Sequence, residues 1–412
     1  MYRAIRKISK CAKNTLDKVS FSYHVKNSLK GCSNAREGTM PIKLEKVSNK
    51  ETHDLFINLP YEMHKNHSLW VPPLKIFEKN YLDPKKNHHI DHSKIVCYLA
   101  YKEGNPAGRI MGIINSKLNE TWAQKQARFC NFESINDNDV AASLFNAVET
   151  WARENGMEEM VGPLGFSNQD PQGFLIEGFG ERPSIGTIYN FEYIPDLVDK
   201  CGYEKEVDYV TYKVVIPEKV PEVYEKIAER LLKRATVRVL EFTKKKDAKR
   251  YIPKILAFMN EAYSGIYGFI PLSEEVIRKT SNTYNQILDP HFLKVIVNEK
   301  DEIVGFIFGI KDVTEGFKKT GGRLIPFGYF QIVCTQKKSK RLDLLLGGIR
   351  EDFRGKGLDT LMAIAMIRSA RDRDMEYVDS HHELESNIKM RAEMERMGGK
   401  VYKRHRVYRK DL

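Results

Sequence analysis

The chain lacks several features that would place it in common classes of protein. Its 412 residues include no apolar run close to the ~18 residues that a membrane-spanning helix needs. Its six cysteines form no Cys-x-x-Cys pair and stand near no histidine at ligand spacing. They therefore predict free thiols in a reducing compartment and no zinc site. At ~100–200 residues per domain, the length predicts two or three domains.

Basic residues are in excess, but the excess is uneven. The formal net charge is +12 at pH 7, and residues 1–39 hold nine Lys or Arg and two acidic residues, which gives +7. The remaining 373 residues are only mildly basic, which argues against nucleic acid as the partner. Residues 402–409 alternate aromatic and basic side chains, and we interpret them as a half-buried edge strand rather than an RNA-stacking surface.

The N-terminal extension, residues 1–39, has no apolar segment of the kind that a secretory signal requires. Its Arg, Lys and Ser content fits a mitochondrial-type presequence if the source is a eukaryote. A disordered basic arm or an over-extended start is the alternative, because Met40 begins the first well-patterned segment.

The most informative stretch is Arg-Gly-Lys-Gly-Leu at residues 354–358, between a predicted strand over 342–349 and a predicted helix over 358–375. The first backbone N–H groups of a helix have no partner inside the helix and favour an anion. Two glycines permit positive φ and close approach of a ligand, and the Arg and Lys add charge. The stretch predicts a phosphate-binding turn, with an ordinary basic turn as the alternative.

Two common phosphate motifs do not fit this turn. A P-loop would need Gly at Arg350 and Ser or Thr at Gly357, and a dinucleotide fingerprint would need Gly at Thr360.

The turn resembles the acyl-CoA pyrophosphate loop of the GNAT acyltransferase superfamily, with Arg354 and Gly357 in register and Asp359 where the pattern has Gly or Ala. The resemblance implies acyl-CoA or acetyl-CoA as co-substrate and no metal. The cofactor-binding residues that it predicts are Gly348, Ile349, Arg354, Gly355, Lys356, Gly357, Leu358, Asp359 and Asn387.

An internal repeat accompanies the loop. Gly108–Gly112 and Gly305–Gly309 are offset by 197 residues, and each follows a strand and a turn. Asn190 matches Asn387 and Gly202 matches Gly399 at the same offset, and each Asn is expected to open a helix. Chance alignment of a few residues is the alternative.

The repeat predicts an α/β protein of two tandem GNAT-like domains, each a mixed, mostly antiparallel twisted sheet flanked by helices. We place a degenerate domain at 40–215 and a domain with the acyl-CoA loop at 225–412. The first copy has the acidic residues 136–140 where the second has its glycine loop, and acidic side chains repel pyrophosphate. One cofactor site, in the second copy, is expected.

Catalysis needs a base for the amine and, in many GNAT proteins, a Tyr in the last helix as the acid. The positions that match this Tyr are Val198 and Met394. The best local candidates for catalysis are His381, His382, Glu383 and Glu385, at the end of the strand after the cofactor helix. Alternation would place His382 on one face and the other three on the opposite face. Solvated helix-capping residues are the alternative.

Two further segments are candidates for binding the substrate. The first is the loop over residues 162–179, dense in Gly, Pro and amides, and the second is an aromatic segment over 263–271. The predicted substrate-binding residues are Asn168, Asp170, Glu177, Tyr263 and Tyr267. Turn formation and core packing are the alternatives.

The resemblance implies an N-acyltransferase that moves an acyl group from CoA to a primary amine. Similarity to the bacterial ceramide synthases narrows the expected acceptor to a long-chain or sphingoid amine. The expected partners are a small-molecule or lipid amine and, peripherally, a membrane, in the cytoplasm or at the inner face of the membrane, or in mitochondria in a eukaryote. The alternative function is a non-catalytic acyl-CoA-binding or lipid-sensing protein.

Overall fold

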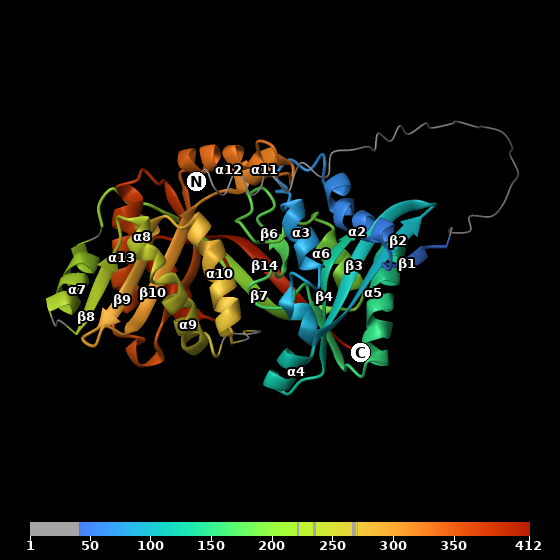
Figure 1. Ribbon diagram of the computed structural model, residues 1–412, viewed down its shortest axis with the longest axis horizontal. Helices are drawn as coiled ribbons and strands as arrows, with labels where there is room; N and C mark the ends of the chain where they lie inside the picture. The colour runs from blue at the N-terminus through green and yellow to red at the C-terminus, as the bar shows by residue number, and fades with distance from the viewer. Residues whose placement is uncertain (1–40, 221, 234–235, 266–268, 270) are drawn as a thin grey trace, which may run out of the picture. The chain divides into compact units, whose positions relative to one another are not determined.

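The computed structural model describes residues 41–220, 222–233, 236–265, 269 and 271–412 (Figure 1). The N-terminal extension and Tyr267 lie outside these residues, so the predictions made for them stay predictions.

The N-terminal half, residues 41–215, alternates strands and helices. Its elements are β1 (Lys43–Lys46), α2 (Lys50–Met63), α3 (Lys75–Tyr81), the 3-10 helix η1 (His88–His92), β2 (Ser93–Lys102), β3 (Asn105–Asn115), α4 (Ser116–Trp122), β4 (Gln126–Ser134), α5 (Asn138–Glu154), β5 (Glu159–Gly162), β6 (Phe174–Glu177), α6 (Ile194–Lys200) and β7 (Glu204–Val215).

The C-terminal half, residues 222–412, follows a similar order. Its elements are α7 (Glu222–Lys233), β8 (Val237–Glu241), α8 (Lys245–Lys249), α9 (Ile252–Ala262), α10 (Glu274–Ile287), η2 (Pro290–Phe292), β9 (Leu293–Asn298), β10 (Ile303–Lys311), α11 (Thr314–Thr320), α12 (Gly328–Lys338), β11 (Arg341–Ile349), η3 (Glu351–Phe353), α13 (Leu358–Arg371), β12 (Tyr377–Asp379), β13 (Glu383–Leu384), α14 (Ile388–Arg396) and β14 (Lys400–Asp411).

The strand pairings match between the halves. In the N-terminal half, β2 pairs with β3 and β3 with β4 in antiparallel fashion, and β4 pairs with β5 in parallel. In the C-terminal half, β9, β10, β11 and β12 repeat these three pairings in the same order. The expected α/β fold class, with mostly antiparallel strands flanked by helices, is confirmed.

The last strand of each half pairs with the sheet of the other half. The central strand order is β5-β14-β7-β12, so β14 lies beside β5 and β7 lies beside β12. Figure 1 shows β14 and β7 side by side. The edge-strand interpretation of residues 402–409 is therefore wrong, because β14 has partners on both sides. Residues 41–412 form one compact unit, and the domain boundaries near 215 and 225 stay predictions.

Two equivalent helices pack through apolar faces. In α5, Val140, Leu144 and Val148 recur every four residues and are fully buried. In α13, Leu358, Leu361 and six further apolar or small positions supply the buried face. α13 begins at the predicted residue and ends four residues early, where Asp372 follows as the C-cap.

The two asparagines of the repeat have different roles. Asn387 caps α14, because its side chain accepts a hydrogen bond from Met390 N at 3.3 Å. Asn190 does not open α6. Its side chain instead accepts from Leu175 N at 2.8 Å and donates to Leu175 O at 3.2 Å. These bonds fix the loop before α6 to β6.

Two predictions about the whole chain can be compared with the described residues. Their four cysteines are unpaired, as expected. Among these residues, no helix has both the length and the apolar composition needed to cross a membrane.

Candidate functional site

The N-termini of α13 and α5 differ in the way that a single phosphate site requires. Gly357 is the N-cap of α13, with φ of 84°, and has no side chain to cap the helix, while Asp359 Oδ1 accepts from Thr360 N at 2.8 Å. Asp137 is the N-cap of α5, and its carboxylate accepts from Asp139 N at 2.9 Å and Val140 N at 3.0 Å. The N-cap carboxylate thus fills the anion position of α5, whereas the N–H groups of Leu358 and Asp359 at the start of α13 are open to a ligand among the described residues.

We expect Asp137→Ala to lower the free energy of unfolding by about 1 kcal/mol, since two backbone donors lose their acceptor. Acyl-CoA affinity should stay unchanged, because the acyl-CoA site is predicted at α13. Chemical denaturation and titration of the same variant check both points, and a loss of acyl-CoA affinity would place a second site at α5.

The loop itself is fixed at its first residue. Arg354 Nε donates to Ile349 O at 3.2 Å and Nη2 donates to Ala262 O at 3.1 Å, so this guanidinium ties the loop to β11 and α9. Lys356 is exposed, with its Nζ 5.1 Å from the centroid of the Phe353 ring. Lys356 is therefore the loop side chain free to reach a phosphate.

Other predicted cofactor residues contribute through the backbone. The side chain of Leu358 is 3% exposed and lies in the core, so only its N–H can face the ligand. Asp359 lies beside Glu393 of α14, whose pKa is raised by burial and by this neighbouring carboxylate. Gly348 and Ile349 end β11 immediately before the loop, and a side chain at 348 would come 3.1 Å from the Tyr263 ring.

A gap opens between β11 and β12. The two strands pair over only three residues, from Arg341–Tyr377 to Asp343–Asp379, and the rest of β11 has β10 as its partner. Residues 344–349 of β11 are partly exposed, whereas 341–343 are buried.

The equivalent gap of the N-terminal half is closed. After β5, the chain stays hydrogen-bonded to β4, with Leu164 N donating to Phe129 O at 2.9 Å. Leu164, Phe166 and Phe129 are at most 2% exposed. Among the described residues, the C-terminal half alone combines a helix with a glycine N-cap and an open gap.

Buried charges hold the point at which β11 and β12 diverge. Asp343 and Asp379, opposite each other in the register, are both 0% exposed. Arg341 Nε lies 2.7 Å from Asp343 Oδ1, and Lys403 Nζ lies 3.0 Å from Asp379 Oδ2. Asp379 also accepts from Ser184 Oγ at 2.6 Å and from the Tyr402 hydroxyl. This network joins a loop of the N-terminal half to β11, β12 and β14.

The charges make the two carboxyl groups differ. Burial raises the pKa of Asp343 in spite of the nearby Arg341. Burial acts in the same direction on Asp379, but Lys403 and Arg341 outweigh it and hold its pKa below the usual range. Asp379 is thus the ionised member that fixes the geometry of the gap.

Glu383 has the most distinctive environment of the four predicted catalytic residues. It is half-buried on β13, and among the described residues its carboxylate has no hydrogen-bond or ion-pair partner. Burial alone raises its pKa to about 8. The charge of Glu383 also contributes to the raised pKa of Tyr263, whose hydroxyl donates a hydrogen bond to Gly347 O of β11. Glu383 is thus a carboxylate near the gap that can accept a proton near neutral pH.

The other three predicted catalytic residues are bound elsewhere. His381 has φ of 60°, and its Nε2 donates to Ile185 O at 2.8 Å. His382 stacks on Tyr209 at 5.2 Å, and burial lowers its pKa well below the ordinary value. Glu385 is paired with Lys205 at 2.7 Å and with Arg404, and the Lys205 hydrogen bond lowers its pKa. The expected alternation fails at His381, because its positive φ interrupts the strand.

The predicted substrate residues do not gather at the gap. Asp170 caps its own loop by accepting from Ser167 N at 3.1 Å, and burial raises its pKa to about 6. The carbonyl of Asn168 accepts from Gln172, and Glu177 is paired with Arg404 at 3.2 Å on β14. Tyr263 does lie at β11, where its hydroxyl donates to Gly347 O at 2.8 Å. These contacts favour turn formation for Asn168 and Asp170, which was the alternative interpretation.

Sequence patterns missed three residues that surround the candidates. Lys403 holds Asp379, Tyr209 stacks on His382, and Gln172 accepts from the Tyr209 hydroxyl at 3.1 Å. The only available signal was the alternation of β14, which we had assigned to an edge strand.

The positions that match the catalytic Tyr of GNAT proteins are buried. Val198 is 0% exposed and Met394 is 4% exposed, each inside a core cluster. Neither position could present a proton donor to the gap.

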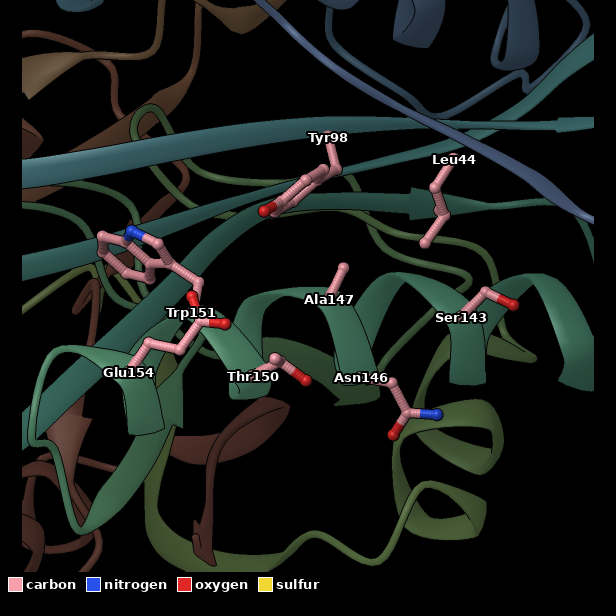
Figure 2. Close-up of a pocket in the computed structure, with 8 residues that line it drawn as sticks. All are labelled: Leu44, Tyr98, Ser143, Asn146, Ala147, Thr150, Trp151 and Glu154. Carbon is pink, nitrogen blue, oxygen red and sulfur yellow. The ribbon is translucent and has the colours of Figure 1, made fainter.

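A pocket outside the candidate site is shown in Figure 2. It has a volume of about 450 Å³ and is open to solvent between β1, β2 and α5. None of the predicted site residues lines it. A cavity of about 10 Å³, lined by apolar residues of α9, α10, β10 and β11, includes Leu346 of the gap.

Comparison with known proteins agrees with this geometry. A tandem GNAT protein from the clavulanic acid biosynthesis pathway superposes with a TM-score of 0.51 and 11% identity, over 90% of this chain and 98% of that one. The chain has the fold of a tandem GNAT protein. A glucosamine N-acetyltransferase region of a fungal β-N-acetylglucosaminidase gives the same TM-score at 11% identity, over 91% of this chain and 38% of that one.

Two curated relatives each match more than four fifths of the chain. The bacterial ceramide synthase of Caulobacter vibrioides is 28% identical over 370 residues, which cover 87% of this chain and 94% of that protein. Protein YghO of Escherichia coli K12 is 25% identical over 371 residues, 88% of this chain and 94% of that one. No family model matches the chain.

Proposed function

We propose that this tandem GNAT protein is an acyl-CoA-dependent N-acyltransferase with one active site, at the gap between β11 and β12. The observation that carries the proposal is the gap itself, because it is open beside a helix with a glycine N-cap in one half, whereas the hydrogen bond from Leu164 N to Phe129 O closes it in the other. The pyrophosphate would lie on the loop before α13, held by backbone N–H groups and Lys356. The thioester would then lie along β11, near Glu383.

Glu383 is the proposed general base. The amine nitrogen attacks the thioester carbonyl carbon and forms the C–N bond, while the Glu383 carboxylate accepts the proton from nitrogen. The tetrahedral intermediate then breaks its C–S bond and releases the amide and the CoA thiolate. Val198 and Met394 are buried, so no Tyr of the last helix protonates the departing thiolate. A thiolate is less basic than an alkoxide and leaves more readily without a proton donor.

A long-chain or sphingoid amine is the proposed acceptor. The bacterial ceramide synthase of Caulobacter vibrioides matches 87% of the chain. The partly exposed leucines 344–346 offer contacts for hydrocarbon next to the gap.

The experiment mixes purified protein with acetyl-CoA or a long-chain acyl-CoA and an amine, either long-chain or water-soluble. The proposal predicts release of free CoA thiol that depends on the amine, with the matching amide detected by mass spectrometry. Acyl-CoA binding without thiol release on any amine would instead support a non-catalytic acyl-CoA-binding protein, the function that the buried Val198 and Met394 favour.

A further inference from the structure

An exposed aromatic cluster lies on the segment between β10 and β11. Four apolar side chains around the start of α12 are 62–69% exposed, and we call them the α12 patch: Ile325, Phe327, Tyr329 and Phe330. The equivalent connection of the N-terminal half, residues 116–125, is much shorter than residues 312–340. A cluster of large apolar side chains facing water, on an element absent from the other half, indicates an interaction surface.

The α12 patch is held in place. A side chain at Gly316 of α11 would come 2.5 Å from Ile332 Cα, so the two helices are in close contact, side by side in Figure 1. Lys75 N donates to Gly322 O at 2.9 Å and ties the segment to the start of α3. Phe77 of the same helix is 55% exposed.

The charge around the patch selects an anionic partner. Residues 314–340 contain six basic residues and one acidic residue, Glu315. Glu315 is itself paired with Arg182 at 3.2 Å and Lys319 at 3.4 Å. The N-terminal extension carries +7, and a second copy would present the same basic segment, so both would be repelled.

We propose that the α12 patch docks the protein on the surface of an anionic lipid bilayer. Aromatic and aliphatic side chains would enter the interface while the surrounding Lys and Arg contact lipid phosphates, the composition expected of an interfacial element. Nothing in this step depends on acyl transfer.

The placement also suits the proposed reaction. α12 joins β11 at Arg341, and the phosphate loop follows Ile349 at the other end of this nine-residue strand. At ~3.3 Å per residue the two ends lie about 30 Å apart. A bilayer at α12 would therefore leave the CoA loop in water. This point alone rests on the proposed function.

Vesicle flotation of the full chain tests the docking surface. Vesicles of phosphatidylcholine with phosphatidylglycerol should bind the wild type, and pure phosphatidylcholine vesicles should bind it weakly. The aromatic variant Phe327→Ser/Phe330→Ser and the charge variant Lys337→Glu/Lys338→Glu should each bind anionic vesicles roughly tenfold more weakly or worse.

Matched controls separate this surface from general effects. Val215→Ser/Ile388→Ser removes apolar side chains that are 67% and 75% exposed elsewhere, and Lys244→Glu/Lys246→Glu reverses two exposed charges on α8 and its N-cap. Both controls should bind anionic vesicles as the wild type does. Wild-type binding by the two α12 variants would overturn the proposal and leave an acidic protein as the candidate partner. Acyl transfer to a water-soluble amine should be unchanged in the α12 variants, so the two proposals fail separately.

Discussion

Glu383→Gln should lower kcat by about 10²–10⁴-fold, because the attacking amine loses the carboxylate that accepts its proton. Acyl-CoA affinity should change little, since the loop before α13 is separate from β13. The measurement is thiol release at saturating acyl-CoA, with Glu385→Gln as the matched control. Glu385 is paired with Lys205 and Arg404, so its loss should not remove the base. Equal activity in wild type and Glu383→Gln would exclude Glu383 as the base.

The same residue predicts a pH profile. With a pKa of about 8, the Glu383 carboxyl is protonated and inactive as a base at low pH, so kcat should rise as the pH increases through about 8. Ionisation of the amine adds a second rise that both proteins share. The rise near pH 8 should be absent from the residual activity of Glu383→Gln.

Stability should move in the opposite direction to activity. A carboxyl group whose pKa is raised on folding, from 4.5 to about 8, stabilises the fold below pH 4.5 and loses that contribution as the pH rises through about 8. Gln carries no charge, so Glu383→Gln should be more stable than wild type at pH 8, by on the order of 2 kcal/mol for this half-buried group. If Glu383→Gln and the wild type differ in free energy of unfolding by the same amount at pH 5 and pH 8, Glu383 is solvated.

Lys403→Met should lower the free energy of unfolding by about 3–5 kcal/mol. The Lys403 and Asp379 side chains are 1% and 0% exposed, and removing one partner leaves a carboxylate buried with less compensation. Chemical denaturation at pH 7 measures the loss. Because Asp379 lies where β11 and β12 separate, activity should fall as well, even where the variant remains folded.

Lys205→Met provides the matched control for Lys403→Met. Lys205 pairs with the carboxylates of Asp208 and Glu385, but its side chain is 43% exposed. Its loss should cost less than about 1 kcal/mol. A comparable cost for the two variants would show that the Asp379 network does not hold the gap.

Local features of the site were predictable from the sequence. The turn at 354–358 and the helix that follows it depend on neighbouring residues, and their spacing alone indicates an open helix N-terminus. The sequence also showed that the first copy lacks the glycine loop. The structure was needed to show that Asp137 caps α5 at the same place. Glu383 could be proposed because it ends a strand beside the cofactor helix.

Long-range features were not predictable. The exchange of β7 and β14 between the halves joins segments almost two hundred residues apart, so a local pattern placed β14 at an edge. The network around Asp379 gathers Ser184, Arg341 and Lys403 from three distant segments. The positive φ of His381 reversed the expected facing of its side chain, because alternation holds only in a regular strand.

Titration of acyl-CoA into the wild type, without amine, tests the account most directly. We predict one site per chain, weakened roughly tenfold or more by Lys356→Glu and abolished by Gly357→Glu, with Asp137→Asn binding as the wild type does. Circular dichroism confirms folding of Gly357→Glu, whose new side chain would meet Leu231 at a position with φ of 84°. Two sites per chain, or unchanged affinity in both loop variants, would contradict the assignment of a single acyl-CoA site to the C-terminal half.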